Sequence, residues 1–207
     1  NEAPITGEAS MLANFTNEGG YRYRYRYLKN IMGLWMIQSI RRELNGVSYV
    51  EGSKKTAAAQ RQWSYAELEA EARGCADFMS RVDVNDSSFL APESMSKEVQ
   101  KACAESGQQV PQGIWETAAV IYNSLAECYA QTAREIEAMT GVVYDCIHVI
   151  GGGANAEYLN RLTAHACHKK IYAGPVEATA IGNISAQMIA AGELENLKTA
   201  RECIYHG

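Results

Sequence analysis

Residues 142–153 read VVYDCIHVIGGG, an apolar run that ends at three consecutive glycines. An apolar run of about eight residues bounded by glycine is typical of a buried strand rather than a helix. Glycine lets the chain turn sharply and lets a ligand approach the main chain. A helix directly after the turn offers its unpaired N–H groups and the positive end of its dipole to an anion. We therefore predict a strand, then an anion-binding turn at Gly151, Gly152 and Gly153.

The residues after the glycines continue this alternation of elements. We expect a helix over 154–168, a strand over 170–173, a helix over 177–191 and a last helix from Glu193. Alternating strands and helices are typical of an α/β layer. The middle of the chain has helical periodicity instead, with expected helices over 28–44, 64–81, 94–106 and 111–140 and a polar connector over 55–63. The fold class predicted is α/β with a helical middle section.

Residues 21–27 read YRYRYRY, and a strand with this alternation carries tyrosines on one face and Arg22, Arg24 and Arg26 on the other. Two interpretations are open. One is a strand with one packed face and one face in water. The other is a surface on which RNA bases stack. The net charge of −5 favours the first interpretation, because nucleic-acid-binding surfaces are usually basic.

Composition indicates a folded protein that acts on neither nucleic acid nor membrane. Apolar residues make up 47% and charged residues 21% of the 207 residues. No apolar run approaches the roughly 18 residues of a membrane helix, and no signal peptide is visible. The six cysteines are widely spread without a C-x-x-C pair, and most lie on apolar faces of expected elements, which favours buried, reduced thiols in a cytoplasmic protein. Because the chain opens at Asn1 with loop-like residues, we expect it to be part of a longer protein.

Local motifs do not identify a nucleotide site by themselves. The glycines fit neither the G-x-x-x-x-G-K-[ST] phosphate loop nor the G-x-G-x-x-G dinucleotide turn. His165 and His168 are spaced to share a helical face, but surface histidines near a helix end explain them better than a metal site. Asn30 and Gln38 are polar positions on one broad face of the expected helix over 28–44, and their spacing assigns them no role.

Longer sequence blocks are more specific. They are NFTNEGG at 14–20, YRYLKNIMGLWMIQ at 25–38, IGGGANAEYLNRL at 150–162 and AGPVEATAIGN at 173–183. Together, and in this order, they resemble the FGGY family of carbohydrate kinases. The resemblance runs from about residue 13 to the last helix.

The resemblance implies a two-lobed enzyme with an actin-like, ribonuclease H-like fold and a cleft between the lobes. ATP and sugar bind there, and with Mg²⁺ the γ-phosphoryl group passes to the 1-hydroxyl of L-rhamnulose, leaving ADP. It further implies that Gly152 lies at the nucleotide and that Asn30 and Gln38 contact it. With the flanking Gly151 and Gly153, these residues form the expected nucleotide site.

The family's catalytic aspartate and its sugar-contacting residues would lie upstream of Asn1. The resemblance therefore implies that residues 1–207 are the C-terminal nucleotide-binding lobe, inactive without an N-terminal lobe as partner. Oligomeric state is left open. A kinase of another ketose, such as L-fuculose or D-xylulose, remains an alternative, as does a non-catalytic actin-like module that binds nucleotide or sugar.

Overall fold

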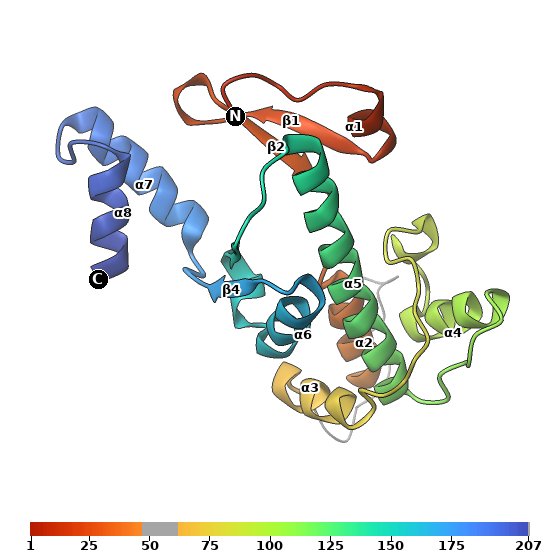
Figure 1. Cartoon of the computed structure of the whole chain (residues 1–207). Coiled ribbons are helices and arrows are strands. Elements are labelled where there is room, and N and C mark those ends of the chain that lie inside the picture. Colours follow the sequence, from red (N-terminus) through yellow and green to blue (C-terminus); the bar gives the residue numbers. More distant parts are fainter. Residues whose placement is uncertain (47–61, 207) are drawn as a thin grey trace.

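The computed structural model describes residues 1–46 and 62–206, which form a mixed α/β fold around one long helix (Figure 1). The strands are β1 (Phe15–Gly19), β2 (Tyr25–Lys29), β3 (Cys146–Val149) and β4 (Lys170–Ala173). The helices are α1 (Glu8–Leu12), α2 (Trp35–Leu44), α3 (Tyr65–Gly74), α4 (Met95–Glu105), α5 (Ile114–Thr140), α6 (Glu157–Cys167), α7 (Ala178–Ala191) and α8 (Leu197–His206). The expected α/β class with a helical middle is confirmed, although the described strands form two separate small sheets.

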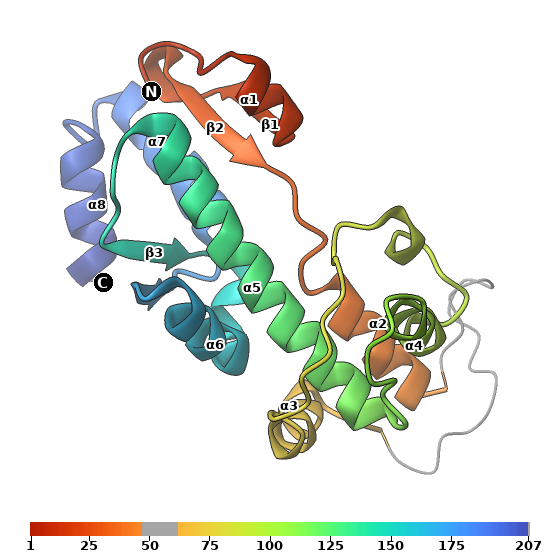
Figure 2. The same ribbon diagram turned by 45° about the vertical axis from the view of Figure 1, so that its right-hand side comes forward.

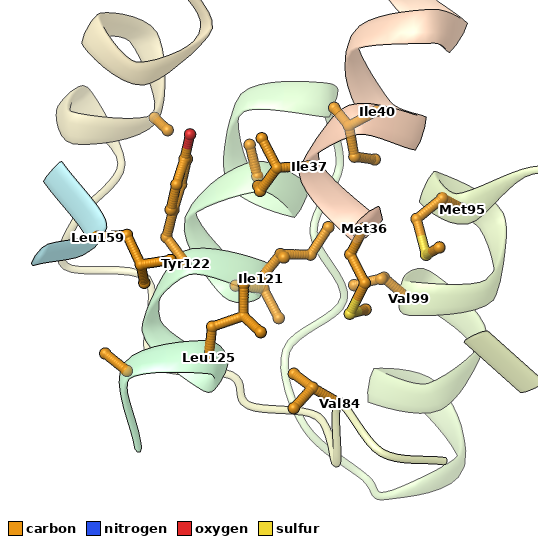
Figure 3. Packing of buried hydrophobic residues seen from close by; sticks show 14 of the residues in the cluster. Met36, Ile37, Ile40, Val84, Met95, Val99, Ile121, Tyr122, Leu125 and Leu159 are labelled. Carbon is orange, nitrogen blue, oxygen red and sulfur yellow. The ribbon is translucent and has the colours of Figure 1, made fainter. Parts of the chain in front are cut away.

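Helix α5 is the centre of the core. Its apolar stripe places Ile121 and Leu125 at full burial, and Gly141 ends the helix at a φ of 67°, as the sequence predicts. Helices α2, α3, α4 and α6 pack around it and contribute buried side chains that include Met36, Ile37, Ile40, Leu68, Met95, Val99 and Leu159 (Figure 3). Burial of each such side chain contributes about 1.5–3 kcal/mol, so this cluster is the main source of stability.

Side-chain caps fix where α3 and α4 begin. Ser64 and Glu67 form a capping box at the start of α3, because Ser64 accepts the N–H of Glu67 while the Glu67 carboxylate accepts the N–H of Ser64. Ser94 caps α4 by accepting the N–H of Lys97, without a reciprocal bond. The prediction that α3 continues to residue 81 is wrong, since the helix ends at Gly74. Most of the connector expected over 55–63 lies outside the described residues.

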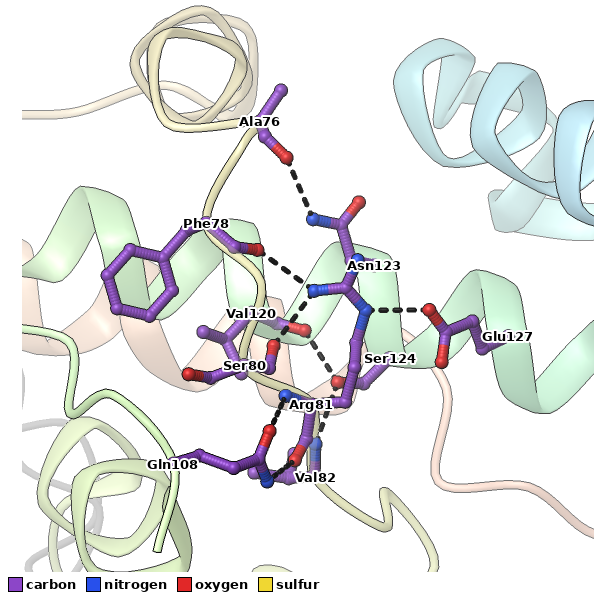
Figure 4. Close-up of polar contacts among 10 residues, drawn as sticks. All are labelled: Ala76, Phe78, Ser80, Arg81, Val82, Gln108, Val120, Asn123, Ser124 and Glu127. Carbon is purple, nitrogen blue, oxygen red and sulfur yellow. Dashed lines mark hydrogen bonds and ion pairs between the residues drawn. The ribbon is translucent and has the colours of Figure 1, made fainter. Parts of the chain in front are cut away.

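The segment after α3 is not helical and makes polar contacts along α5 (Figure 4). The guanidinium of Arg81 donates to the Glu127 carboxylate at 2.7 Å and to the carbonyls of Phe78 and Ser80. The N–H of Val82 donates to the Ser124 hydroxyl at 3.0 Å. These bonds join the segment after α3 to α5.

The two sheets differ in topology. Strands β1 and β2 are antiparallel, with Phe15 opposite Lys29 and Gly19 opposite Tyr25. Strands β3 and β4 are parallel, with Cys146 opposite Lys170, and α6 forms the crossover between them. The long apolar run predicted a buried strand over 142–150. The strand is shorter, Cys146–Val149, and its residues are at most half-buried. Residues 142–145 lie outside the strand and are exposed.

The YRYRYRY segment is not one strand. Arg22 and Tyr23 have φ values of 55° and 59° and form a short 3-10 turn, after which the strand β2 starts at Tyr25. The N–H of Gly20 closes this turn on the Arg24 carbonyl at 2.7 Å. The packed-face interpretation therefore holds for Tyr27, whose ring stacks on Phe15, but not for Tyr23, which is 98% exposed.

The last two helices lie apart from the helical core in both views (Figures 1 and 2). Helix α7 matches the predicted helix over 177–191 within one residue, whereas α8 begins at Leu197 rather than near Glu193. Across residues 1–46 and 62–206, no helix is both long and apolar enough to cross a membrane.

Candidate functional site

The three glycines lie in a short 3-10 helix, Gly151–Asn155, between β3 and α6. Gly151 has a φ of 72°, a conformation that side chains with a Cβ rarely adopt, so its backbone requires glycine. Its N–H donates to the Pro175 carbonyl at 3.1 Å, and the N–H of Gly174 donates to the Val149 carbonyl at 2.8 Å. The turn is thereby bonded to the loop that leads into α7.

The other two glycines are not fixed by φ. A Cβ on Gly153 would lie 3.4 Å from the Val149 side chain, while a Cβ on Gly152 would meet no atom of the chain within 4 Å. Gly152 therefore faces open space that a ligand can enter. None of the residues that the structure describes comes close enough to require a glycine at this position.

The helix after the turn starts later than predicted. We expected it from residue 154, but α6 begins at Glu157, because the glycines and the two following residues form the 3-10 turn. The main-chain N–H of Tyr158 in the first turn of α6 donates to the carboxylate of Glu69 on α3. A carboxylate of the chain itself therefore already occupies part of the positive helix end that was expected to receive an anion.

Asn160 is a residue of this site that the sequence pattern did not reveal. Its side-chain amide donates to the carbonyls of Gly153 and Ala154, both at 3.3 Å, and so braces the turn from the first turns of α6. An asparagine shortly after a glycine turn is a signal for such a bond, because its amide can reach back to carbonyls that the turn leaves free.

Asn30 and Gln38 do not share a helix as predicted. Leu28 and Lys29 belong to β2, and Gly33 turns the chain at a φ of 63°, so α2 begins only at Trp35. Asn30 is exposed in the loop after β2, and Gln38 is half-buried on α2. The helical periodicity therefore fails for Leu28 and Lys29, which pair with Thr16 and Phe15 of β1.

A cavity of about 420 Å³ adjoins both segments. Gly153 and Asn160 line one wall, Ile31 and Leu34 line another, and the remaining walls are mostly apolar side chains of α5, β3 and α6. Ile31 follows Asn30 directly, and the N–H of Gln38 donates to the Leu34 carbonyl at 2.9 Å. Of the predicted site residues only Gly153 lines the cavity itself, whereas Asn30 and Gln38 come near it only through Ile31 and Leu34, which also line it.

An ion pair closes one part of the cavity wall. Lys169 Nζ donates to Glu137 Oε1 and to the Tyr144 carbonyl, each at 2.7 Å. The Lys169 bond, followed by a bond from the Tyr144 N–H, lowers the pKa of Glu137. Both charged side chains are less than one-fifth exposed, so the pair joins α5 to the start of β4.

Side chains of the types that bind metal ions do not cluster among the described residues. Within 1–46 and 62–206, no group of three or more histidine, cysteine, aspartate or glutamate side chains is placed to hold a metal ion. His165 and His168 are both exposed, with ring centres 6.2 Å apart. All six cysteines are free thiols, but only Cys103 is fully buried, so the expectation of buried thiols holds for that residue alone.

Comparison with known proteins identifies the family. The model of the C-terminal domain of the FGGY family of carbohydrate kinases matches residues 1–191, which include the glycine turn, α2 and α7. The chain belongs to the FGGY family. This FGGY domain is 44% identical over 205 residues to a rhamnulokinase of Halalkalibacterium halodurans, covering 99% of this chain and 40% of the relative.

Two further relatives have the same name. A rhamnulokinase of Oceanobacillus iheyensis is 42% identical over 206 residues, which is 100% of this chain and 40% of that protein. A rhamnulokinase of Bacillus subtilis is 39% identical over 204 residues, which is 99% of this chain and 39% of that protein. The FGGY domain therefore spans about 40% of the length of the curated relatives it matches.

Proposed function

We propose that this chain is the nucleotide-binding lobe of an ATP-dependent kinase that phosphorylates L-rhamnulose to L-rhamnulose 1-phosphate in rhamnose catabolism in the cytoplasm. The proposal is supported by the family and by the name rhamnulokinase that the similar proteins share. The observation that carries the nucleotide part is the open space at Gly152 beside a cavity that Ile31 and Leu34, before the start of α2, also line. A glycine at this position leaves the main chain open to close approach by a ligand.

In this proposal Gly151, Gly152 and Gly153 lie against the nucleotide, and Asn30 and Gln38 contact it from the segment that contains Ile31 and Leu34. Gly151 is held by the Pro175 carbonyl, and Asn160 braces Gly153. Both contacts fix the turn before the nucleotide arrives, which reduces the entropy lost on binding. Because Glu69 already bonds to the start of α6, the negatively charged phosphates would extend away from that helix end.

The remaining chemistry belongs to a second lobe. Phosphoryl transfer depends on positioning and charge stabilisation, with a carboxylate that accepts the proton of the attacking hydroxyl. We assign that carboxylate and the sugar contacts to an N-terminal lobe of the kind that completes the relatives. Mg²⁺ would be held largely by the nucleotide phosphates, where it neutralises developing charge. A ribonuclease H-like arrangement would then join the two small sheets into one layer.

The test is a substrate panel on the full-length kinase, meaning the polypeptide that carries this chain as its C-terminal part at the length of the relatives. With ATP and Mg²⁺ it should phosphorylate L-rhamnulose faster than L-fuculose or D-xylulose, and this chain alone should show no turnover. A preference for either other ketose contradicts the assigned sugar. Turnover by this chain alone contradicts the two-lobe assignment, and an inactive full-length protein that still binds nucleotide favours the non-catalytic module.

A further inference from the structure

Glu69 of α3 lies at the start of α6, the helix beside it (Figure 1). The main-chain N–H of Tyr158, in the first turn of α6, donates to Glu69 Oε1. The Glu69 side chain is 18% exposed, and Arg73 Nη2 forms an ion pair with the same oxygen at 4.0 Å. A helix N–H and a guanidinium are also groups by which proteins bind phosphate. The carboxylate therefore stands where a phosphate could otherwise bind.

The start of α6 follows the glycine turn directly in the chain. The turn ends at Asn155 and α6 begins at Glu157, so Tyr158 is the second residue of the helix. A glycine-rich turn that leads into a helix commonly binds nucleotide phosphates on the first N–H groups of that helix. Here a phosphate at the Tyr158 N–H would lie against the Glu69 carboxylate, and two negative charges that share one site repel each other. Glu69 therefore competes with the nucleotide for the start of α6.

The packing of α3 fixes the position of this carboxylate. Leu68 and Ala72, on either side of Glu69 in the sequence, have no exposed surface and belong to the core around α5. The capping box of Ser64 and Glu67 fixes the first turn of the same helix. Moving α3 away would expose buried apolar side chains to water, which is unfavourable. Glu69 is therefore expected to stay in place when a nucleotide binds.

We propose that Glu69 is a positioning residue that excludes the nucleotide phosphates from the start of α6, so that the nucleotide binds in a single orientation. Glu69 does not touch the reacting atoms and acts only through the place left to the phosphates. The inference rests on the proposed function, because it takes Gly151–Gly153 as the nucleotide turn. It does not depend on which sugar is phosphorylated.

The first experiment adds inorganic pyrophosphate to this chain and measures its melting temperature. About 10 mM pyrophosphate should raise the melting temperature of Glu69→Ala by about 2 °C or more, because the probe replaces the missing carboxylate at the Tyr158 N–H. The parent should change by less than about 0.5 °C under the same conditions. Glu71→Ala is the matched control, since it removes an exposed carboxylate from the same helix and should behave as the parent does. Adding Arg73→Ala to Glu69→Ala should abolish the response, because the guanidinium is then lost as well.

The second experiment uses the full-length kinase. Glu69→Ala should lower kcat and the KM for ATP together, each by about threefold or more, because phosphates bound at the start of α6 hold ATP where it cannot react. Loss of a merely structural contact would raise KM instead. Glu69→Gln removes only the charge and keeps an oxygen for the Tyr158 N–H, so both constants should lie between those of the parent and Glu69→Ala. This variant replaces Glu69→Ala if the latter does not fold.

A Glu69→Ala chain that does not respond to pyrophosphate overturns the proposal. A Glu69 variant of the full-length kinase with a raised KM for ATP overturns it too, because Glu69 then only supports the fold. A parent kinase that binds no nucleotide contradicts the proposed function itself, and the pyrophosphate response of this chain then decides whether Glu69 excludes phosphate. A kinase that shows both Glu69 effects but prefers another ketose refutes only the assigned sugar.

Discussion

Glu69 on α3 accepts the main-chain N–H of Tyr158, so a carboxylate from one helix caps the start of another. Arg73 of α3 lies over the Tyr158 ring, with 4.9 Å between its guanidinium carbon and the ring centre. These two contacts join α3 to the start of α6, the helix that follows the glycine turn in the chain. The position of the turn therefore depends on a helix that lies more than seventy residues earlier in the chain.

Replacement of Glu69 by alanine should lower the free energy of unfolding by about 1 kcal/mol, because it removes a capping bond and a charge that is favourable at a helix N-terminus. Urea denaturation of this chain measures the change. Glu71→Ala is the control, since Glu71 is exposed on the same helix. Equal stability of the two variants would show that the Glu69 cap contributes nothing.

Gly152→Leu should leave stability within about 0.5 kcal/mol of the parent, because a Cβ there meets no atom within 4 Å. In the full-length kinase it should weaken ADP binding at least tenfold, or about 1.4 kcal/mol, which calorimetry measures. Gly151→Ala is the contrasting variant and should cost about 1–2 kcal/mol of stability, because its φ is 72°. An unchanged ADP affinity in Gly152→Leu removes that glycine from the nucleotide site.

Local sequence signals predicted the elements whose ends are set by their own residues. The Ser64–Glu67 box, the Ser94 cap and Gly141 act within one or two helical turns, and each begins or ends a helix where expected. Strand β4 was also placed correctly over 170–173. These signals do not depend on distant parts of the chain, so a single sequence is sufficient to locate them.

Long-range contacts decided the elements that were misplaced. Leu28 and Lys29 continue a helical pattern, yet pairing with β1 takes them into β2 and separates Asn30 from α2. Helix α3 ends at Gly74, and the segment after it is joined to α5 by the bond of Arg81 to Glu127, residues 46 positions apart. Long-range contacts also determine the candidate site, so part of it could not be predicted from the sequence. Gly151–Gly153 were visible as a turn, but the Asn160 brace and the Glu69 cap arise only from the folded chain.

Stability should fall in acid through Glu137, because hydrogen bonds from Lys169 Nζ and then from the Tyr144 N–H lower the pKa of its carboxyl. A carboxyl with a lowered pKa in the folded state stabilises that state at pH values above its unfolded pKa, and the contribution disappears as pH falls through the folded pKa. Glu137→Gln should therefore be less stable than the parent near neutral pH and lose less stability between about pH 5 and pH 3.

Denaturation at several pH values measures this difference. Glu202→Gln is the control, because its pair with Lys198 is an exposed contact at 3.9 Å and should change neither the stability nor its pH dependence. A Glu137→Gln protein with the acid response of the parent would mean that the bonds to Lys169 and Tyr144 do not stabilise the fold.

Thiol reactivity should follow burial. Cys203 is exposed, whereas Cys103 has no exposed surface and burial raises the pKa of its thiol, which reduces the reactive thiolate. A maleimide added to the native chain should modify Cys203 first and reach Cys103 only on unfolding, as peptide mass spectrometry would record. Equal rates at both residues would show that α4 is not packed against α5.

Two leucines test the position of the core. Leu125 of α5 is 0% exposed, and Leu12 at the end of α1 is 75% exposed. Leu125→Ala should cost about 3–5 kcal/mol of unfolding free energy, because it removes buried apolar surface and leaves a cavity between helices. Leu12→Ala should cost less than about 0.5 kcal/mol, since the deleted atoms already face water. Urea denaturation of both variants measures the difference, and similar costs would contradict a core centred on α5.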